Sequence, residues 1–199
     1  FSASVLDGEG EKFTFANYVK ILGRPFYRGA VANTLMIGVA ATLTTIVVSV
    51  PFAFALARLP VPGKAAIIAL AAMPLVLPSF VSAYAIVLLL GRAGVVTQWL
   101  NSWGIGFGSI YGAGGIILVY TLTLYPYVLL PTMAGFKAVD VSIEEAAQSL
   151  GAGWFTILFK VIFPNVFISV INGAFITFAI VMGEFTIASL LSQPTFGPY

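Results

Sequence analysis

The chain has 199 residues, of which 60% are hydrophobic and only 8% are charged, whereas about 25% of the residues of a soluble domain carry charge. This composition excludes an ordinary soluble globular protein, and the lack of cysteine and histidine excludes disulfide scaffolds, thiolate or imidazole zinc sites, and Ser-His or Cys-His catalysis. A net charge of +2 without a basic cluster longer than a pair predicts no nucleic-acid partner.

The N-terminal segment, residues 1–29, is polar and mixed in charge, so we expect it to lie outside the membrane. Apolar residues recur at helical spacing between Phe13 and Leu22, which predicts a short interfacial helix in a run that Pro25 interrupts. The chain begins with Phe1 rather than Met and ends on a turn-like stretch. We therefore expect a piece of a longer chain, with a further span downstream.

The charged residues leave four long uncharged gaps, each long enough for a membrane span of about 20 residues. The predicted spans are about 30–57, 65–90, 116–136 and 165–191. The first is dense in Ala, Thr, Ser and Gly, so we expect one of its sides to pack closely against protein. Pro74 and Pro78 predict a kink in the second span. The predicted fold class is an all-α integral membrane protein, with a transmembrane domain over residues 30–199.

The stretch between the second and third spans is rich in glycine and predicts a loop at the membrane interface. Trp99 and Trp103 lie four residues apart beside apolar neighbours. This spacing predicts a short amphipathic helix in the headgroup layer.

Residues 140–164 contain three acids within six residues and predict an amphipathic segment that does not span the membrane. Ser142, followed three residues later by Glu145, predicts a capping box at the start of a helix of about nine residues. Gly151 is expected to end that helix in the left-handed conformation. Ile143, Ala146, Ala147 and Leu150 form its apolar stripe.

The spacing in this segment resembles the cytoplasmic EAA loop of ABC importer permeases. That loop reads EAA, three residues, Gly, nine residues, an aliphatic residue, any residue, Leu and Pro. Here Glu145-Ala146-Ala147 is followed by Gly151, and Val161 and Phe163-Pro164 complete the pattern. The only departures replace one apolar residue with another. Similar segments elsewhere extend the resemblance over about residues 14–199: ANTL, RLPVPGK, MPLVLPSFVSAYAIVLLLGRAG and GEFTIASLL.

The resemblance implies a type I-like permease core of about four spans plus a cytoplasmic coupling helix, in a multi-pass protein of the bacterial inner membrane. The implied partners are a cytoplasmic ABC ATPase dimer, a second permease half (the same or a homologous chain), an extracytoplasmic substrate-binding protein and the lipid bilayer. The chain itself is expected to be neither an enzyme nor a cofactor-binding protein, because its GAGG run lacks the lysine of a phosphate-binding loop. This orientation divides the nine cations four inside and five outside, which gives no positive-inside signal.

The resemblance also implies which residues couple the permease to the ATPase: Ser142, Glu144, Glu145, Ala146, Ala147, Leu150 and Gly151. Glu184 and Asn172, in the fourth apolar run, are candidate pathway residues. Glu184 is either a carboxylate at the rim of the membrane or a pathway group that favours a cation. The run GEFTIASLL is similar to that of permeases for iron(III), polyamines or aminophosphonates, which are the favoured substrates.

Two alternatives compete with the importer. An ion-coupled secondary carrier or channel would use Glu184 and the proline kinks as a gated path without ATP, and a purely structural subunit would use the acidic loop only to dock another protein. The capped acidic helix at this spacing favours the importer, since a carrier has no need for such a helix.

Overall fold

The computed structural model describes residues 23–106 and 109–192. The predicted interfacial helix between Phe13 and Leu22 lies outside these residues. Every regular element in the described ranges is a helix. In chain order they are α2 (Pro25–Arg58), α3 (Lys64–Ala72), a 3-10 turn (Met73–Leu75), α4 (Ser79–Leu90), α5 (Val95–Ser102), α6 (Ala113–Ala138), α7 (Val141–Ser149), α8 (Trp154–Ile157), a π-helical turn (Leu158–Ile162), α9 (Phe163–Gly183) and α10 (Thr186–Leu191).

Four helical stretches in the described residues are long and apolar enough to cross a membrane. They are Pro25–Arg58, Ser79–Ser102, Ala113–Ala138 and Trp154–Gly183. The all-α membrane fold with about four spans is therefore confirmed. The helices α2 and α6 contain the predicted spans 30–57 and 116–136 and extend beyond them at both ends. Pro25 is the first residue of α2, because proline is well suited to the first helical turn.

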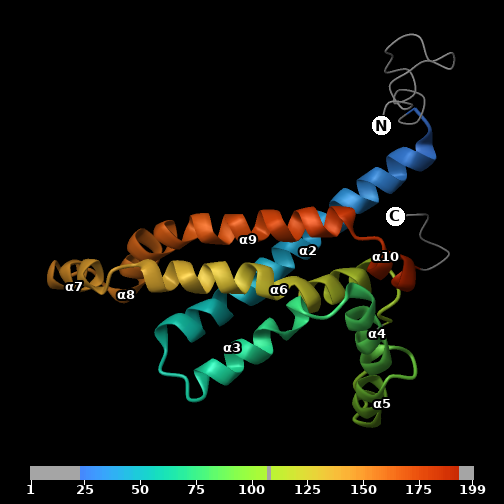
Figure 1. The fold of residues 1–199 in the computed structure, drawn as a ribbon, viewed down its shortest axis with the longest axis horizontal. Helices are drawn as coiled ribbons and strands as arrows, with labels where there is room; N and C mark the ends of the chain where they lie inside the picture. Colours follow the sequence, from blue (N-terminus) through green and yellow to red (C-terminus); the bar gives the residue numbers. More distant parts are fainter. Residues whose placement is uncertain (1–22, 107–108, 193–199) are drawn as a thin grey trace.

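The prediction of one kinked helix over residues 65–90 is wrong. The first part, α3, passes into the 3-10 turn, and α4 starts only after Pro78, whose backbone is extended. Proline lacks the N–H that would continue the ladder, and it also disfavours the helical conformation in the residue before it. As a result α4 turns away from the long axis of α6 and α9 (Figure 1), and the span-length stretch here is formed by α4 and α5.

The C-terminal boundary of the fourth predicted span, about 165–191, is wrong, and its N-terminal boundary lies inside the observed helix. The helix starts at Trp154 and runs through the π-helical turn into α9 without a break. The π-helical turn ends two residues before Pro164, whose ring would clash with a carbonyl in a regular helix. At the other end α9 stops at Gly183, because Glu184 is extended and the chain begins α10.

The helix α6 is the centre of the bundle, with α2 and α9 packed along it (Figure 1). The small-residue side of α2 is buried, whereas Val47 on its other side is 71% exposed, so the predicted close packing of this span is confirmed. Two hydrogen bonds join α2 to α6. The hydroxyls of Thr44 and Thr121 lie 2.6 Å apart, and Ser49 donates to the carbonyl of Tyr125 at 3.0 Å. Such polar contacts hold helices together where lipid supplies no hydrophobic drive.

The close approach of α9 to α6 depends on Gly173. A Cβ at this position would lie 2.7 Å from both the carbonyl oxygen of Tyr127 and the Cα of Val128. These are backbone atoms in the middle of a helix, so they cannot rotate away as a flexible side chain could.

We expect Gly173→Ala to destabilise the protein by about 1–3 kcal/mol, because the added methyl group forces α9 away from α6. Thermal unfolding in detergent, followed by circular dichroism, measures this as a lower Tm. The matched control is Gly114→Ala in α6, where a Cβ would meet no atom within 4 Å. Equal melting temperatures for the two variants would contradict the proposed close packing.

Candidate functional site

The residues proposed for coupling and those proposed for the pathway lie in different parts of the bundle. The helices α7 and α8 lie at one end of the long axis of the molecule, and α10 lies towards the other end (Figure 1). Glu184 lies two residues before the start of α10. The structure therefore separates the coupling helix from Glu184 by the length of α9.

The helix α7 contains nine residues, which confirms its predicted length, but its cap differs from the prediction. The N-cap is Asp140, whose carboxylate accepts a hydrogen bond from the Ser142 N–H at 2.9 Å. The capping box with Ser142 as the cap is therefore wrong. Val139 is buried at the end of α6, so the chain turns at Asp140. The aspartate side chain, and not that of Ser142, therefore lies next to the first-turn amides.

This capping bond affects the charge of Asp140. The backbone N–H of Ser142, and then its side chain, hold the pKa of the Asp140 carboxyl below its ordinary value. Asp140 is exposed to solvent, so the cap is ionised at neutral pH. A negative charge at this position also interacts favourably with the N-terminal end of the helix dipole.

The helix α7 ends at the turn formed by Gly151. This residue has φ +83°, so the prediction of a left-handed stop is confirmed. The N–H of Gly151 donates to the carbonyl of Gln148 at 2.9 Å, and that of Ala152 donates to Ala147 at 3.0 Å. No atom lies within 4 Å of where a Cβ would be. Glycine is therefore required here for its conformation and not for lack of space.

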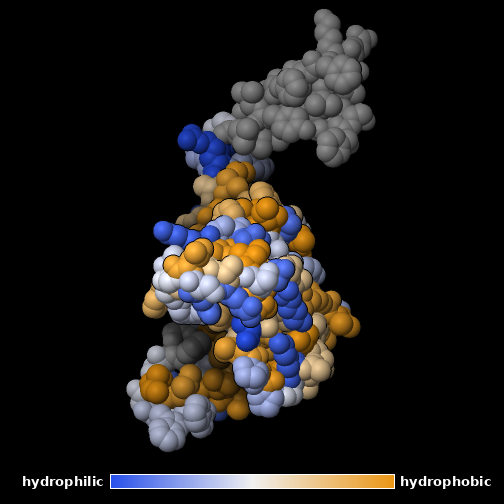
Figure 2. Space-filling view, turned by 90° about the vertical axis from the view of Figure 1, so that its left-hand side faces the viewer, coloured by the Kyte–Doolittle hydropathy of each residue, from blue (hydrophilic) through white to orange (hydrophobic). Residues whose placement is uncertain are grey.

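Most of the circumference of α7 and of the turn after it is open. Val141 and Ile143 are 55% and 51% exposed, Leu150 is 89% exposed, and Glu145 and Ala146 are exposed beside them. We call these five residues the outer face of α7. Figure 2, which views the molecule from the α7 end, shows apolar side chains interspersed with polar ones. A surface that mixes apolar, small and acidic groups is suited to contact with another protein.

Glu144 points the other way, towards the rest of the chain. Its Oε1 lies 2.6 Å from a terminal guanidinium nitrogen of Arg58, at the end of α2, and both side chains are largely buried. Of the two neighbouring glutamates, only Glu145 belongs to the outer face. Sequence reasoning missed Arg58 as a partner, because no local spacing connects the end of the first span with a residue in the loop after the third.

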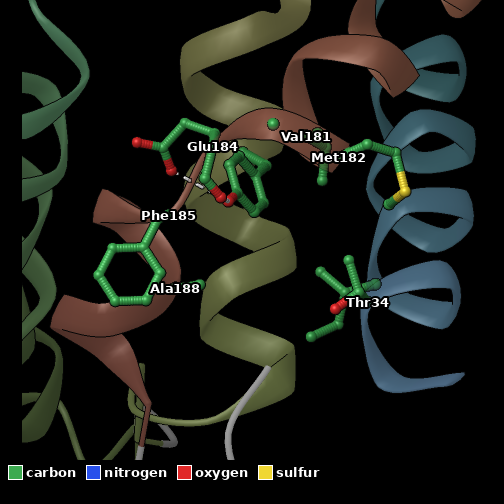
Figure 3. Close-up of a pocket in the computed structure, with 9 residues that line it drawn as sticks. Thr34, Val181, Met182, Glu184, Phe185 and Ala188 are labelled. Atoms are coloured by element: carbon green, nitrogen blue, oxygen red, sulfur yellow. Dashed lines mark hydrogen bonds between the residues drawn. The ribbon is translucent and has the colours of Figure 1, made fainter. Parts of the chain in front are cut away.

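The carboxylate of Glu184 holds the start of α10. Its Oε1 accepts from the N–H of Thr186 at 3.0 Å, and its Oε2 accepts from the N–H of Ile187 at 2.9 Å and from the hydroxyl of Tyr120 at 3.1 Å. Glu184 and Thr34 of α2 both line a pocket, and Figure 3 shows them on opposite sides of it. Sequence reasoning gave no hint of Tyr120, which lies on α6, although a carboxylate two residues before a helix is a recognisable cap.

Asn172 is not close to Glu184. Their positions are twelve residues apart, which corresponds to about 18 Å along a helix, and Asn172 lies on an exposed side of α9. Asn165 is exposed seven residues earlier, so the two asparagines lie on the same side of the helix, two turns apart. No group of three or more acids in the described ranges could hold a metal ion.

We expect Asp140→Ala to increase the hydrogen-exchange rate of the Ser142 amide, because that amide loses its acceptor, whereas Asp140→Ser keeps a capping oxygen and most of the protection. A lowered pKa in the folded state means that the carboxylate stabilises α7 above the unfolded pKa and that this contribution is lost as the pH falls through the folded value. Exchange measured by mass spectrometry at neutral and acidic pH tests both points. Equal protection in the alanine variant would rule out Asp140 as the cap.

Comparison with known proteins adds to this geometry. Residues 49–197 match the family described as "Binding-protein-dependent transport system inner membrane component". The chain is 32% identical over 156 residues to the "Molybdenum transport system permease protein ModB" of Escherichia coli K12, which covers 78% of this chain and 68% of the relative.

Two further relatives are similar over most of this chain. The "Spermidine/putrescine transport system permease protein PotB" of Haemophilus influenzae is 27% identical, over 96% of this chain and 69% of the relative. The "Sulfate transport system permease protein CysW" of Synechococcus elongatus is 29% identical, over 89% of this chain and 61% of the relative. Together with the four membrane-spanning stretches, these matches show that the chain belongs to the family of inner-membrane permease components of binding-protein-dependent ABC importers.

Proposed function

We propose that this permease forms one half of a translocation pathway for a small solute and that separate cytoplasmic ATPase subunits drive it by docking on α7. The observation that carries this proposal is the outer face of α7: a short capped helix, open to solvent at one end of the bundle, in the register of the EAA loop. An extracytoplasmic binding protein would deliver the solute, and a second permease half, the same or a homologous chain, would complete the pathway.

The coupling residues divide into two groups by their position on α7. Ser142, Glu145, Ala146 and Leu150 are exposed and would contact the ATPase. Leu150 offers apolar area, Ala146 permits close approach, and Glu145 would pair with a basic residue of the ATPase. Glu144, Ala147 and Gly151 would act from within the chain. The first two hold α7 against the bundle, and Gly151 makes the turn after it.

We expect Gly151→Val to lower ATP-driven uptake at least tenfold in proteoliposomes that contain the assembled transporter and its binding protein. A β-branched residue cannot easily adopt φ +83°, so α7 would end differently and present another surface. The matched control is Gly153→Ala, in the same turn, where φ is −70° and a Cβ would meet no atom within 4 Å.

Two results would count against the proposal. Normal ATP-driven uptake by the Gly151→Val transporter would remove α7 from the coupling. Uptake by the wild-type chain that needs an ion gradient but neither ATP nor an ATPase subunit would favour the secondary carrier or channel instead.

For the cargo, we favour a cationic solute, iron(III) or a polyamine, over an aminophosphonate. Glu184 places a negative charge beside a pocket at the α10 end of the bundle, and such a charge attracts cations. The spermidine/putrescine permease among the relatives agrees with this choice, and the molybdenum and sulfate permeases do not. We propose that Glu184 has two roles, since its carboxylate also caps α10, and that Asn172 lines the pathway further along α9.

We expect Glu184→Gln to lower the uptake of spermidine or iron(III) several-fold while the amount of ATPase that co-purifies stays the same, because the substitution removes charge far from α7. The matched variant at the other end is Glu145→Gln, which should lower ATPase co-purification. Equal uptake of the cationic solute by the Glu184 variant and the wild type would remove Glu184 from the pathway.

A further inference from the structure

The C-terminal end of α2 contacts the segments on both sides of α7. Phe54 and Arg58 are four residues apart and therefore lie on one side of the last turns of α2. The ring centroid of Phe54 lies 5.4 Å from that of Phe136, near the end of α6. It lies 6.2 Å from the ring centroid of Trp154, at the start of α8. The aromatic contacts thus fix α2 against the chain just before and just after the coupling helix.

Arg58 adds a direct contact with the coupling helix itself. Its guanidinium lies 2.6 Å from Oε1 of Glu144, and the two side chains are only 17% and 12% exposed. An exposed ion pair contributes little to the stability of the fold, because water screens it. A largely desolvated pair leaves a costly unpaired charge if one partner is removed. Because both side chains are largely buried, loss of one partner would leave the other charge unpaired away from water.

The rest of α7 is held loosely. None of its residues is buried, and the only one packed against the hydrophobic core of this end is Ala147, a small side chain that makes no directional contact. A nine-residue helix is also too short to be stable alone. Within the described part of the chain, the ion pair is thus the one polar contact between α7 and a membrane span.

We propose that the Arg58–Glu144 ion pair is a mechanical strut, through which movement of α7 is transmitted to α2. The inference rests on the proposed docking of the ATPase on α7. Arg58 and Glu144 are positioning residues in this scheme, since neither belongs to the outer face. The hydrogen bonds of α2 to α6, through Thr44 and Ser49, would pass the movement on to the centre of the bundle.

The test compares four assembled transporters in proteoliposomes, each assayed for ATPase co-purification, ATP hydrolysis and solute uptake. The double variant Arg58→Gln with Glu144→Gln removes the strut without leaving a lone buried charge. The double variant Arg58→Glu with Glu144→Arg reverses the pair. Lys137→Gln, which removes an exposed cation from the last turn of α6, is the matched control beside the wild type.

We expect the neutral pair to bind the ATPase and hydrolyse ATP at near wild-type rates but to take up at least tenfold less solute per ATP hydrolysed. The reversed pair should recover most of this loss, and Lys137→Gln should resemble the wild type. A purely structural contact would lower all three readouts together. Wild-type coupling in the neutral pair, or a reversed pair as poorly coupled as the neutral one, would overturn the strut.

A distance measurement tests the strut without reference to transport. The sequence of 199 residues contains no cysteine, so spin labels can be attached to this chain in nanodiscs at Leu59→Cys, after α2, and at Gln148→Cys, on α7. We expect a narrow distance distribution for the native pair, a broad one for the neutral pair and a narrow one for the reversed pair. Identical distributions for the native and neutral pairs would overturn the strut, whereas a lack of ATP-driven uptake by the wild type would count only against the proposed function.

Discussion

A carboxylate beside an apolar layer must be hydrated or paired, because an isolated buried charge costs far more than a short helix can offset. The four acids in the described part of the chain obey this constraint. Asp140 and Glu184 accept hydrogen bonds from the first amides of α7 and α10, and Glu144 pairs with Arg58. Glu145 is exposed, and its side chain has no partner within the described residues.

These pairings explain how two short helices persist next to the bundle. The helices α7 and α10 have nine and six residues, too few for stability in isolation. An acid just before each helix accepts hydrogen bonds from its first amides. Each helix is also tied to a long one, α7 to α2 by Arg58 and α10 to α6 by Tyr120. The acidic side chains thus lie at the two ends of a packed apolar bundle. An ATPase would meet the chain at the α7 end and a solute at the α10 end.

The sequence predicted the parts of the fold that depend on composition or local spacing. The uncharged runs located α2 and α6, and the spacing around Gly151 located a nine-residue helix and its left-handed stop. Prolines were less informative. Pro126 and Pro131 lie inside α6 without ending it, whereas the chain leaves the helix before Pro78. The outcome depends on whether neighbouring helices support the freed backbone groups, which the sequence of one segment does not contain.

The residues that sequence reasoning missed are those whose roles depend on distant contacts. Asp140 and Ser142 are both good caps, and the choice between them was made by the burial of Val139 against the core. Arg58 and Tyr120 come to Glu144 and Glu184 from other helices. Local patterns thus identified the acids as functional candidates, but the tertiary structure determined which acid caps a helix, which one forms an ion pair and which one remains exposed for a partner.

Docking of the ATPase on α7 is the central claim, and site-specific photocrosslinking tests it most directly. A photoreactive amino acid would replace Ile143 on the outer face of α7 in one transporter and Phe185, an exposed residue at the start of α10, in another. Docking on α7 predicts a covalent product with the ATPase from position 143 and none from position 185. A product from position 185, or none from position 143 in a transporter that hydrolyses ATP, would contradict it.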